Sequence, residues 1–302
     1  MAQFPDEQDE SGSFKRQEDE FRDWVDSTEV EPGRYHLYVC KACPWAHRSW
    51  IVLRLMGLED SVTVSFVDPI RDEKGWAFRE GNGHGPDTAE GFEYLSEAYR
   101  ANNPNYNNRV TVPVLWDKKA KRLINNSEDD ICKMFVSQFK ELAKHPVDLF
   151  PQSIEAEQKE LSDLIYESVN NGVYRAGFAT SQSSYEEAYL TLFETLDSLE
   201  NWLGNGGPFL FGDQIVESDW RLFCTLIRFD PVYHGHFKCN KRRITEYPNL
   251  QEYMERLYFT PGIAETVNFD HIKRHYYVTH DDINPTQVVP MGPEMDWLKK
   301  SR

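Results

Sequence analysis

The sequence predicts two domains, a mixed α/β domain followed by an all-α domain. Its 302 residues suit about two domains of ordinary size. A strand, a helix and a second strand follow one another over residues 35–66, which is typical of a right-handed crossover between parallel strands. Beyond residue 153 the apolar residues recur with helical spacing.

The elements of the first domain follow from local patterns. Apolar residues alternate over residues 35–39 and again over 62–66, and each alternation predicts a strand. Between them, Pro44 begins a helix that ends at Gly57, a residue favoured at helix C-termini. The polar stretch over residues 68–109 predicts a long loop with helical character only over 90–101, and loops of this length are usually functional or disordered.

A third strand is predicted over residues 110–116, a short fourth over 123–124, and then a helix with Ser127 and Asp130 as a capping box. This order, β-α-β-(α)-β-β-α, is that of a thioredoxin-like domain, which we place at residues 34–145. The preceding residues 1–33 hold eleven acidic and three basic residues, so we expect an acidic arm. Phe14, Phe21 and Trp24 are its expected anchors on the body of the protein.

The second domain, residues 146–302, is predicted to be helical throughout. Amphipathic helices are expected over residues 155–170 and 185–203, a helix buried on all sides over 220–229, and a further one over 250–257. The aromatic, proline-containing residues 271–290 are expected to form a tail that wraps over the surface.

The composition excludes several classes of partner. A net charge of −17, from 33 basic and 50 acidic residues, argues against nucleic acid and anionic membranes, since both attract basic patches. No apolar run approaches the length of a spanning helix, and the acidic N-terminus resembles neither a signal nor a transit peptide. Five cysteines without an export signal predict free thiols in a reducing, cytoplasmic compartment.

The segment with the clearest chemical meaning is Cys40-Lys41-Ala42-Cys43-Pro44, between the first strand and the first helix. Pro44 suits the first helical position, so Cys43 lies at the helix N-terminus, where unpaired amides favour the thiolate and lower its pKa. Ala46 stands where glutaredoxin-like sites carry a resolving cysteine. We therefore predict a monothiol site with Cys43 as nucleophile and Cys40 as an accessory; the alternative is a pair of inert strand-end thiols.

Two further segments suit the same site. The proline of Val112-Pro113 interrupts a strand-like run, which favours a cis-proline opposite the nucleophile, where the Val112 backbone can pair with an extended thiol peptide. The alternative is an ordinary trans proline at a sheet edge. Ser127 and Glu128, at a predicted helix start, could receive the charged end of a ligand, but such residues are common at helix starts, and taken alone they favour a purely structural cap.

The predicted nucleophile lies in the motif Cys43-Pro44-Trp45-Ala46-His47-Arg48. With this motif the chain resembles the xi-class glutathione transferases, the glutathionyl-hydroquinone reductases, over residues 12–293. The resemblance is not confined to this motif. It extends to other segments throughout the chain: Gly33-Arg34-Tyr35-His36-Leu37-Tyr38, Gly75-Trp76, Arg109-Val110-Thr111-Val112-Pro113-Val114-Leu115-Trp116, Asn170-Asn171-Gly172-Val173-Tyr174, Phe229-Asp230-Pro231-Val232-Tyr233, Gly235-His236-Phe237-Lys238-Cys239-Asn240, His275-Tyr276-Tyr277 and Asn284-Pro285.

The resemblance implies the glutathione transferase architecture, with the thiol site in the thioredoxin-like domain, the substrate site in the helical domain, and a homodimer. It implies reductive removal of the glutathionyl group from glutathionyl-hydroquinones through a mixed disulfide on Cys43. The co-substrate would be glutathione or a related thiol, the substrate a quinone-derived thioether, and no metal is required.

The resemblance also implies roles for single residues. Trp76, Arg109 and Val112, with Pro113, would contact the thiol. Tyr174 and one of the pair Tyr276-Tyr277, with Tyr276 favoured, would hold the hydroquinone hydroxyl, and Tyr233 is a candidate accessory residue.

Two positions depart from the family pattern. The family usually opens its third helix with Glu then Ser, whereas this chain has Ser127 then Glu128, so either the two exchange roles or the preferred thiol differs, for instance γ-glutamylcysteine. Cys40 is the second departure, and we hypothesise that oxidation could join it to Cys43.

Two other functions remain open from the sequence. An omega-like thioltransferase or dehydroascorbate reductase would use the same cysteine, and a non-catalytic interaction module of transferase fold would have no need of it. Gly81-x-Gly83-x-Gly85 lacks the strand and the lysine of a phosphate-binding loop. His234, His236 and Cys239 match no common zinc spacing, so structural roles are expected for them.

Overall fold

The computed structural model describes residues 7–299, and their contacts divide them into two compact units. One unit comprises residues 18–148 and 265–275, and the other comprises residues 7–17, 149–264 and 276–299. The expected acidic arm over residues 1–33 therefore divides after Gln17, and its residues 1–6 lie outside the described part. The change of unit at Asp148 falls close to the border expected at residue 145.

The unit formed around residues 18–148 contains a four-stranded sheet. Its strands are β1 (Tyr35–Val39), β2 (Val62–Phe66), β3 (Val114–Asp117) and β4 (Arg122–Asn125), in the order β2-β1-β3-β4. β1 pairs in parallel with β2, and antiparallel pairs join β1 to β3 and β3 to β4. This mixed sheet with its helices confirms the thioredoxin-like prediction.

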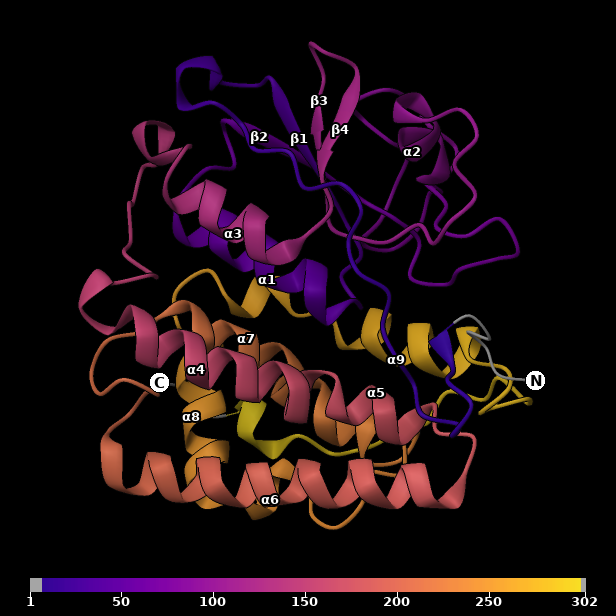
Figure 1. The fold of residues 1–302 in the computed structure, drawn as a ribbon, viewed down its shortest axis with the longest axis vertical. Helices are drawn as coiled ribbons and strands as arrows, with labels where there is room; N and C mark the ends of the chain where they lie inside the picture. The colour runs from indigo at the N-terminus through magenta and orange to yellow at the C-terminus, as the bar shows by residue number, and fades with distance from the viewer. Residues whose placement is uncertain (1–6, 300–302) are drawn as a thin grey trace. The chain divides into compact units, whose positions relative to one another are not determined.

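Three helices accompany this sheet. α1 (Pro44–Leu55) and α3 (Glu128–Val136) pack on each other, and α2 (Ser96–Asn102) lies beside β4, away from that pair (Figure 1). α2 begins later than expected because Gly91 takes a positive φ of 76°, which a helix does not allow. β3 likewise begins at Val114, since Pro113 has no N–H to give to the sheet.

Two details of the predicted local structure are wrong. Among the described residues, the Ser127 side chain makes no capping hydrogen bond; instead the Asp130 carboxylate accepts from Arg22 and from Asn125 (3.1 Å), so no capping box forms. The side chain of Trp24 is 45% exposed, so the expected anchor is not buried, whereas Val25, the next residue, is buried. Phe14 is buried as expected.

The other unit is helical. Its helices are α4 (Glu155–Ile165), α5 (Gly172–Gly177), α6 (Gln182–Gly206), α7 (Glu217–Arg228) and α8 (Pro248–Tyr258), and α9 (Phe269–Thr279) passes from the first unit into this one. α6 packs on α5 and on α8, and α4 packs on α7 (Figure 1). Every residue of α7 is buried, which confirms the expectation for that helix.

The helical unit departs from expectation in two places. The predicted helix over residues 155–170 changes at Ile165 into a π-helical turn, Tyr166–Asn170, which precedes the unpredicted α5. The expected surface tail is wrong over residues 271–279, because these residues form α9 and bury His271, Ile272 and Tyr276. The helix was not predicted because tyrosine and histidine count as polar residues in a sequence pattern, although both can line the buried face of a helix. Residues 281–290 are irregular and none of them is buried, as expected for the rest of the tail.

Candidate active site

Cys43 lies at the N-terminus of α1, as predicted. It is the N-cap residue, with extended backbone angles (φ −73°, ψ 123°), and Pro44 is the first helical residue. Its half-buried thiol lies 3.8 Å from the carbonyl oxygen of Val112, which it approaches as a donor. The Val112–Pro113 peptide bond is cis, so the predicted cis-proline is present and neighbours the thiol.

Cys40 has a different environment from Cys43. It follows the last residue of β1 and is fully buried. Its carbonyl accepts the Cys43 N–H at 3.1 Å, so the two cysteines stand at either end of one turn. Both are free thiols. Only Cys43 is exposed enough to meet a ligand, which supports the separation of roles.

The start of α3 presents Ser127 and Glu128, both buried. The Ser127 N–H donates to the Asn125 side chain at 2.7 Å. The guanidinium of Arg48, buried on α1, lies 3.9 Å from the Glu128 carboxylate and pairs with Asp129. Arg48 belongs to the quoted cysteine motif, yet the sequence offered no sign that it ties the start of α3 to α1.

Trp76 is held between two side chains. The Trp76 ring stacks on that of His275, with 5.2 Å between the centroids and 25° between the planes. The guanidinium carbon of Arg71 lies 5.2 Å from the centroid of the Trp76 ring. His275 is in turn hydrogen-bonded through Nδ1 to the carbonyl of Pro69 at 2.7 Å. Sequence reasoning missed His275 and Arg71 as neighbours of Trp76. Arg109 is half-buried, and its carbonyl accepts the Tyr106 hydroxyl at 2.8 Å.

Three tyrosines from three segments meet in the helical unit. The hydroxyl of Tyr276, on α9, lies 2.6 Å from that of Tyr174, on α5, and 2.9 Å from that of Tyr233. All three are buried. The neighbouring Tyr277 instead directs its hydroxyl to the carbonyl of Pro231, at 3.4 Å. Of the pair that the sequence left open, Tyr276 is therefore the member of this cluster, which we call the phenol cluster (Tyr174, Tyr233, Tyr276).

Two members of the phenol cluster, Tyr233 and Tyr276, keep their protons at physiological pH. Burial raises the pKa of both Tyr233 and Tyr276 well above the usual value of 10, and the adjacent Tyr174 adds to the effect. Arg228, fully buried on α7, opposes it through its charge. These phenols are therefore hydrogen-bond donors and not bases. Sequence reasoning also missed Arg228 as a charged neighbour of the phenol cluster. The available signal was an arginine within a helix that was predicted to be buried on all sides.

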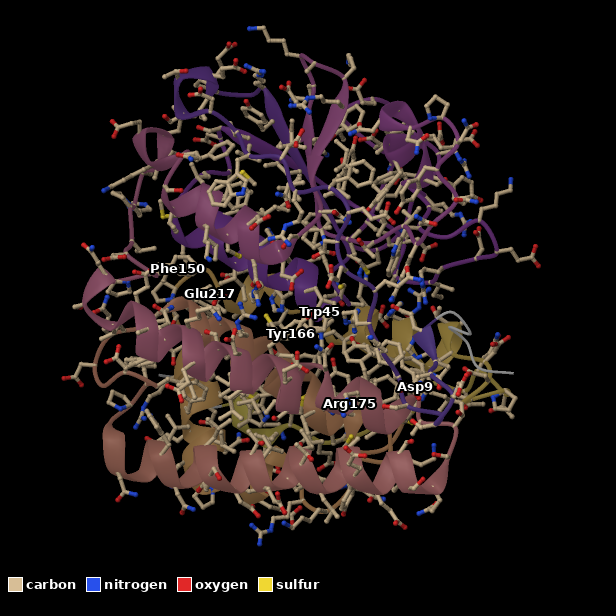
Figure 2. All side chains as sticks on the ribbon, in the orientation of Figure 1. Asp9, Trp45, Phe150, Tyr166, Arg175 and Glu217 are labelled. Atoms are coloured by element: carbon tan, nitrogen blue, oxygen red, sulfur yellow. The ribbon has the colours of Figure 1, made fainter. Side chains whose placement is uncertain are left out.

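Close packing fixes the phenol cluster. The ring of Phe237 lies 5.5 Å from those of Tyr174 and Tyr233 and 5.6 Å from that of Tyr276. Gly177, at the end of α5, makes room for it, because a Cβ there would come within 2.2 Å of the Phe237 ring. Figure 2 marks α5 by Arg175, the residue after Tyr174, and the first turn of α1 by Trp45.

His236, one of the residues considered as a metal ligand, has another histidine as its neighbour. His236 Nε2 lies 3.2 Å from His280 Nδ1, and burial lowers the pKa of His236 to about 4. Within residues 7–299, no group of three or more His, Cys, Asp or Glu side chains is placed to hold a metal ion. In the same part of the chain no helix is long and apolar enough to cross a membrane.

The predicted site residues thus fall into two groups. Those expected to bind and attack the thiol belong to the α/β unit: Cys43, Trp76, Arg109, Val112, Pro113, Ser127 and Glu128. Those expected to hold the substrate belong to the helical unit: Tyr174, Tyr233, Tyr276 and Tyr277.

Comparison with known families identifies both parts of the chain. Residues 42–138 match the family model of the glutathione S-transferase N-terminal domain, and residues 182–256 match that of the C-terminal domain. The fold and these two matches define the class of protein, a glutathione transferase with both of its domains.

Individual relatives narrow the class. The glutathionyl-hydroquinone reductase PcpF of Sphingobium chlorophenolicum is 46% identical over 95% of this chain and 92% of its own. The structure of a xi-class transferase from Natrialba magadii is 47% identical with a TM-score of 0.89, covering 92% of this chain and 86% of its own. That of glutathione-bound YqjG from Escherichia coli is 46% identical with a TM-score of 0.90, covering 92% and 94%. The chain belongs to the xi-class glutathione transferases, the glutathionyl-hydroquinone reductase family, which confirms the resemblance seen in the sequence.

Proposed function

We propose that this protein is a glutathionyl-hydroquinone reductase. It removes the glutathionyl group from glutathionyl-hydroquinones, consumes one further glutathione or related thiol, and releases hydroquinone and the thiol disulfide. The observation that carries the proposal is the placement of the Cys43 thiol at the N-terminus of α1, 3.8 Å from the backbone carbonyl of Val112. That backbone can pair with the extended peptide of a bound thiol while the helix end favours a thiolate.

In the first step the Cys43 thiolate attacks the sulfur of the substrate thioether. Before the attack, the sulfur-bearing ring carbon takes up a proton while the ring hydroxyl loses one, which gives the keto tautomer of the substrate. A disulfide then forms between Cys43 and the glutathionyl group, and the carbon–sulfur bond breaks with its electron pair passing through the ring to the carbonyl oxygen. That oxygen becomes a phenolate and takes up a proton, so the hydroquinone is reduced as the two sulfurs are oxidised. One nucleophilic thiolate suffices for this step.

In the second step a free glutathione thiolate attacks the glutathionyl sulfur of the mixed disulfide. Glutathione disulfide leaves and Cys43 returns as a thiolate. No second protein cysteine takes part, which agrees with the burial of Cys40 and with Ala46 at the position of a resolving cysteine.

We assign the hydroquinone hydroxyl to the phenol cluster, with Tyr174 and Tyr276 in catalytic roles and Tyr233 supporting Tyr276. Neutral, buried phenols can donate hydrogen bonds to an oxygen that gains negative charge as the carbon–sulfur bond breaks. Their rings offer a flat apolar surface to an aromatic substrate. An omega-like thioltransferase or dehydroascorbate reductase needs no such cluster.

We assign the thiol to Trp76, Arg109, Val112, Pro113, Ser127 and Glu128. Ser127 and Glu128 stand in the reverse of the family order, and Glu128 lies 3.9 Å from Arg48. We therefore propose that Glu128 receives the amino group of the γ-glutamyl end while the N-terminus of α3 receives its carboxylate.

The decisive experiment is intact-mass detection of the adduct on Cys43. Wild-type protein given a glutathionyl-hydroquinone and limiting thiol should gain one glutathionyl group, and Cys43→Ser should gain none. An unmodified wild type would refute the reductase proposal. Faster turnover of a mixed disulfide or of dehydroascorbate than of a glutathionyl-hydroquinone would favour the omega-like alternative, and an inert wild type would favour the interaction module.

We further propose that the protein is a homodimer and that it lies in the cytoplasm, a reducing compartment in which its five cysteines stay reduced. Light scattering coupled to gel filtration measures the oligomeric state, and cell fractionation measures the location.

A further inference from the structure

The N-terminal segment of residues 7–17 is fastened to the helical unit next to α5. The Gln8 side chain donates to the carbonyl of Phe178 at 3.0 Å, and the Thr180 N–H donates to the carbonyl of Gly12 at the same distance. The Ser181 hydroxyl donates to the carbonyl of Ser11 at 2.9 Å. Gly12 has a φ of +82°, and a Cβ there would meet Thr180 Oγ1 at 2.6 Å, so the chain passes close to the loop after α5.

This fastening brings two side chains onto Tyr174. Phe14 is buried and stacks on the Tyr174 ring at 6.4 Å and 28°. The Arg16 guanidinium carbon lies 4.9 Å from the centroid of the same ring. Arg16 Nε donates to the side chain of Asn171 at 2.9 Å, and Asn171 is the residue before α5, the helix that carries Tyr174. Arg16 is thus held by the helix whose tyrosine it covers, while Lys15 beside it is exposed.

We propose that Arg16 is a positioning residue for Tyr174, holding its ring in place and strengthening its hydroxyl as a hydrogen-bond donor to the hydroquinone. A cation over the face of an aromatic ring is attracted to its electrons, and it stabilises any negative charge that the phenol oxygen takes up. That charge arises only when the carbon–sulfur bond of a glutathionyl-hydroquinone breaks. This role rests on the proposed function.

The proposal separates two reactions of the same Cys43. Reduction of a small glutathione mixed disulfide uses the thiolate but releases a thiol, so it makes no demand on Tyr174. Reduction of a glutathionyl-hydroquinone uses both. Substitution of Arg16 should therefore slow the second reaction and leave the first unchanged, whereas damage to the fold would slow both.

The experiment compares Arg16→Met, Arg16→Lys and Lys15→Met on both substrates. We expect Arg16→Met to lower kcat for the glutathionyl-hydroquinone by about 3- to 30-fold, the range of a partly to fully desolvated cation–π contact. Arg16→Lys keeps the charge and loses the bond to Asn171, so its loss should be smaller. Lys15→Met removes a charge from the same segment without touching Tyr174 and should match the wild type on both substrates.

The proposal would be overturned if kcat fell equally on both substrates in Arg16→Met and in Arg16→Lys. It would also be overturned if Arg16→Met left kcat for the glutathionyl-hydroquinone unchanged. A wild type that reduces mixed disulfides but no glutathionyl-hydroquinone would overturn the proposed function itself, independently of any Arg16 variant.

Discussion

Removal of the Tyr276 hydroxyl is the sharpest test of the phenol cluster, because the adjacent Tyr277 supplies a matched control. Tyr276→Phe deletes the oxygen that lies 2.6 Å from Tyr174 and 2.9 Å from Tyr233, both inside the protein. Tyr277→Phe deletes one that makes a 3.4 Å bond to the Pro231 carbonyl. Both substitutions keep the ring, so packing changes little.

The expected magnitudes follow from these contacts. Two short buried hydrogen bonds contribute about 0.5–1.5 kcal/mol each, so Tyr276→Phe should lower the free energy of unfolding by about 1–3 kcal/mol. The long bond of Tyr277 contributes at the low end of that range, about 0.5 kcal/mol or less. Loss of a group that assists proton transfer lowers kcat by about 100-fold or more, so Tyr276→Phe should show this loss for glutathionyl-hydroquinones and Tyr277→Phe should not.

Urea unfolding gives the stabilities, and steady-state assay with a glutathionyl-hydroquinone gives kcat. Wild-type kcat in Tyr276→Phe, or an equal loss in Tyr277→Phe, would refute the assignment of Tyr276. If the loss extended to small mixed disulfides, the phenol would serve the fold of the site and not the proton transfer.

Three further predictions concern other parts of the chain. Burial lowers the pKa of His36 from 6.5 to about 4 in the folded protein, so as pH falls the unfolded chain takes up the proton first and the folded state loses stability. Between pH 6.5 and 5 the wild type should lose about 2 kcal/mol of unfolding free energy, and His36→Gln should not lose it. Parallel pH curves for the two proteins in urea unfolding would contradict this. Gly177→Ala should push Phe237 away from the phenol cluster, which should lower the free energy of unfolding by about 1–3 kcal/mol and remove much of kcat. The control Gly206→Ala, whose Cβ meets only Trp202 at 3.8 Å, should change neither quantity in the same assays. Cys40→Ala should retain activity, and oxidation that inactivates the wild type by joining Cys40 to Cys43 should leave Cys40→Ala active. Peptide mass mapping that finds both thiols free in the oxidised wild type would remove the idea of a switch.

Local patterns were enough to predict most of the α/β unit. Alternating apolar residues placed β1 and β2, and Pro44 placed Cys43 at the helix N-terminus, because both signals lie within a few residues of the element they define. The same reasoning failed at α9. Apart from Ile272, its buried residues are histidines and a tyrosine, whose polar groups hide the helical period until their partners are known.

Local sequence patterns were sufficient for the class of fold and for the position of Cys43 at a helix N-terminus, since a cysteine before a helix-starting proline is recognised from neighbouring residues alone. The contacts among the three phenols, by contrast, depend on packing between residues far apart in the chain. Tyr276 contacts Tyr174 across 102 positions and Tyr233 across 43, and the pattern around each tyrosine says nothing of the others. Tyr276 and Tyr277 are indistinguishable in sequence, yet neighbouring residues on a helix point about 100° apart. Which of them reaches the phenol cluster depends on how α9 is turned against the rest of the helical unit, and that orientation is set by packing over the whole unit.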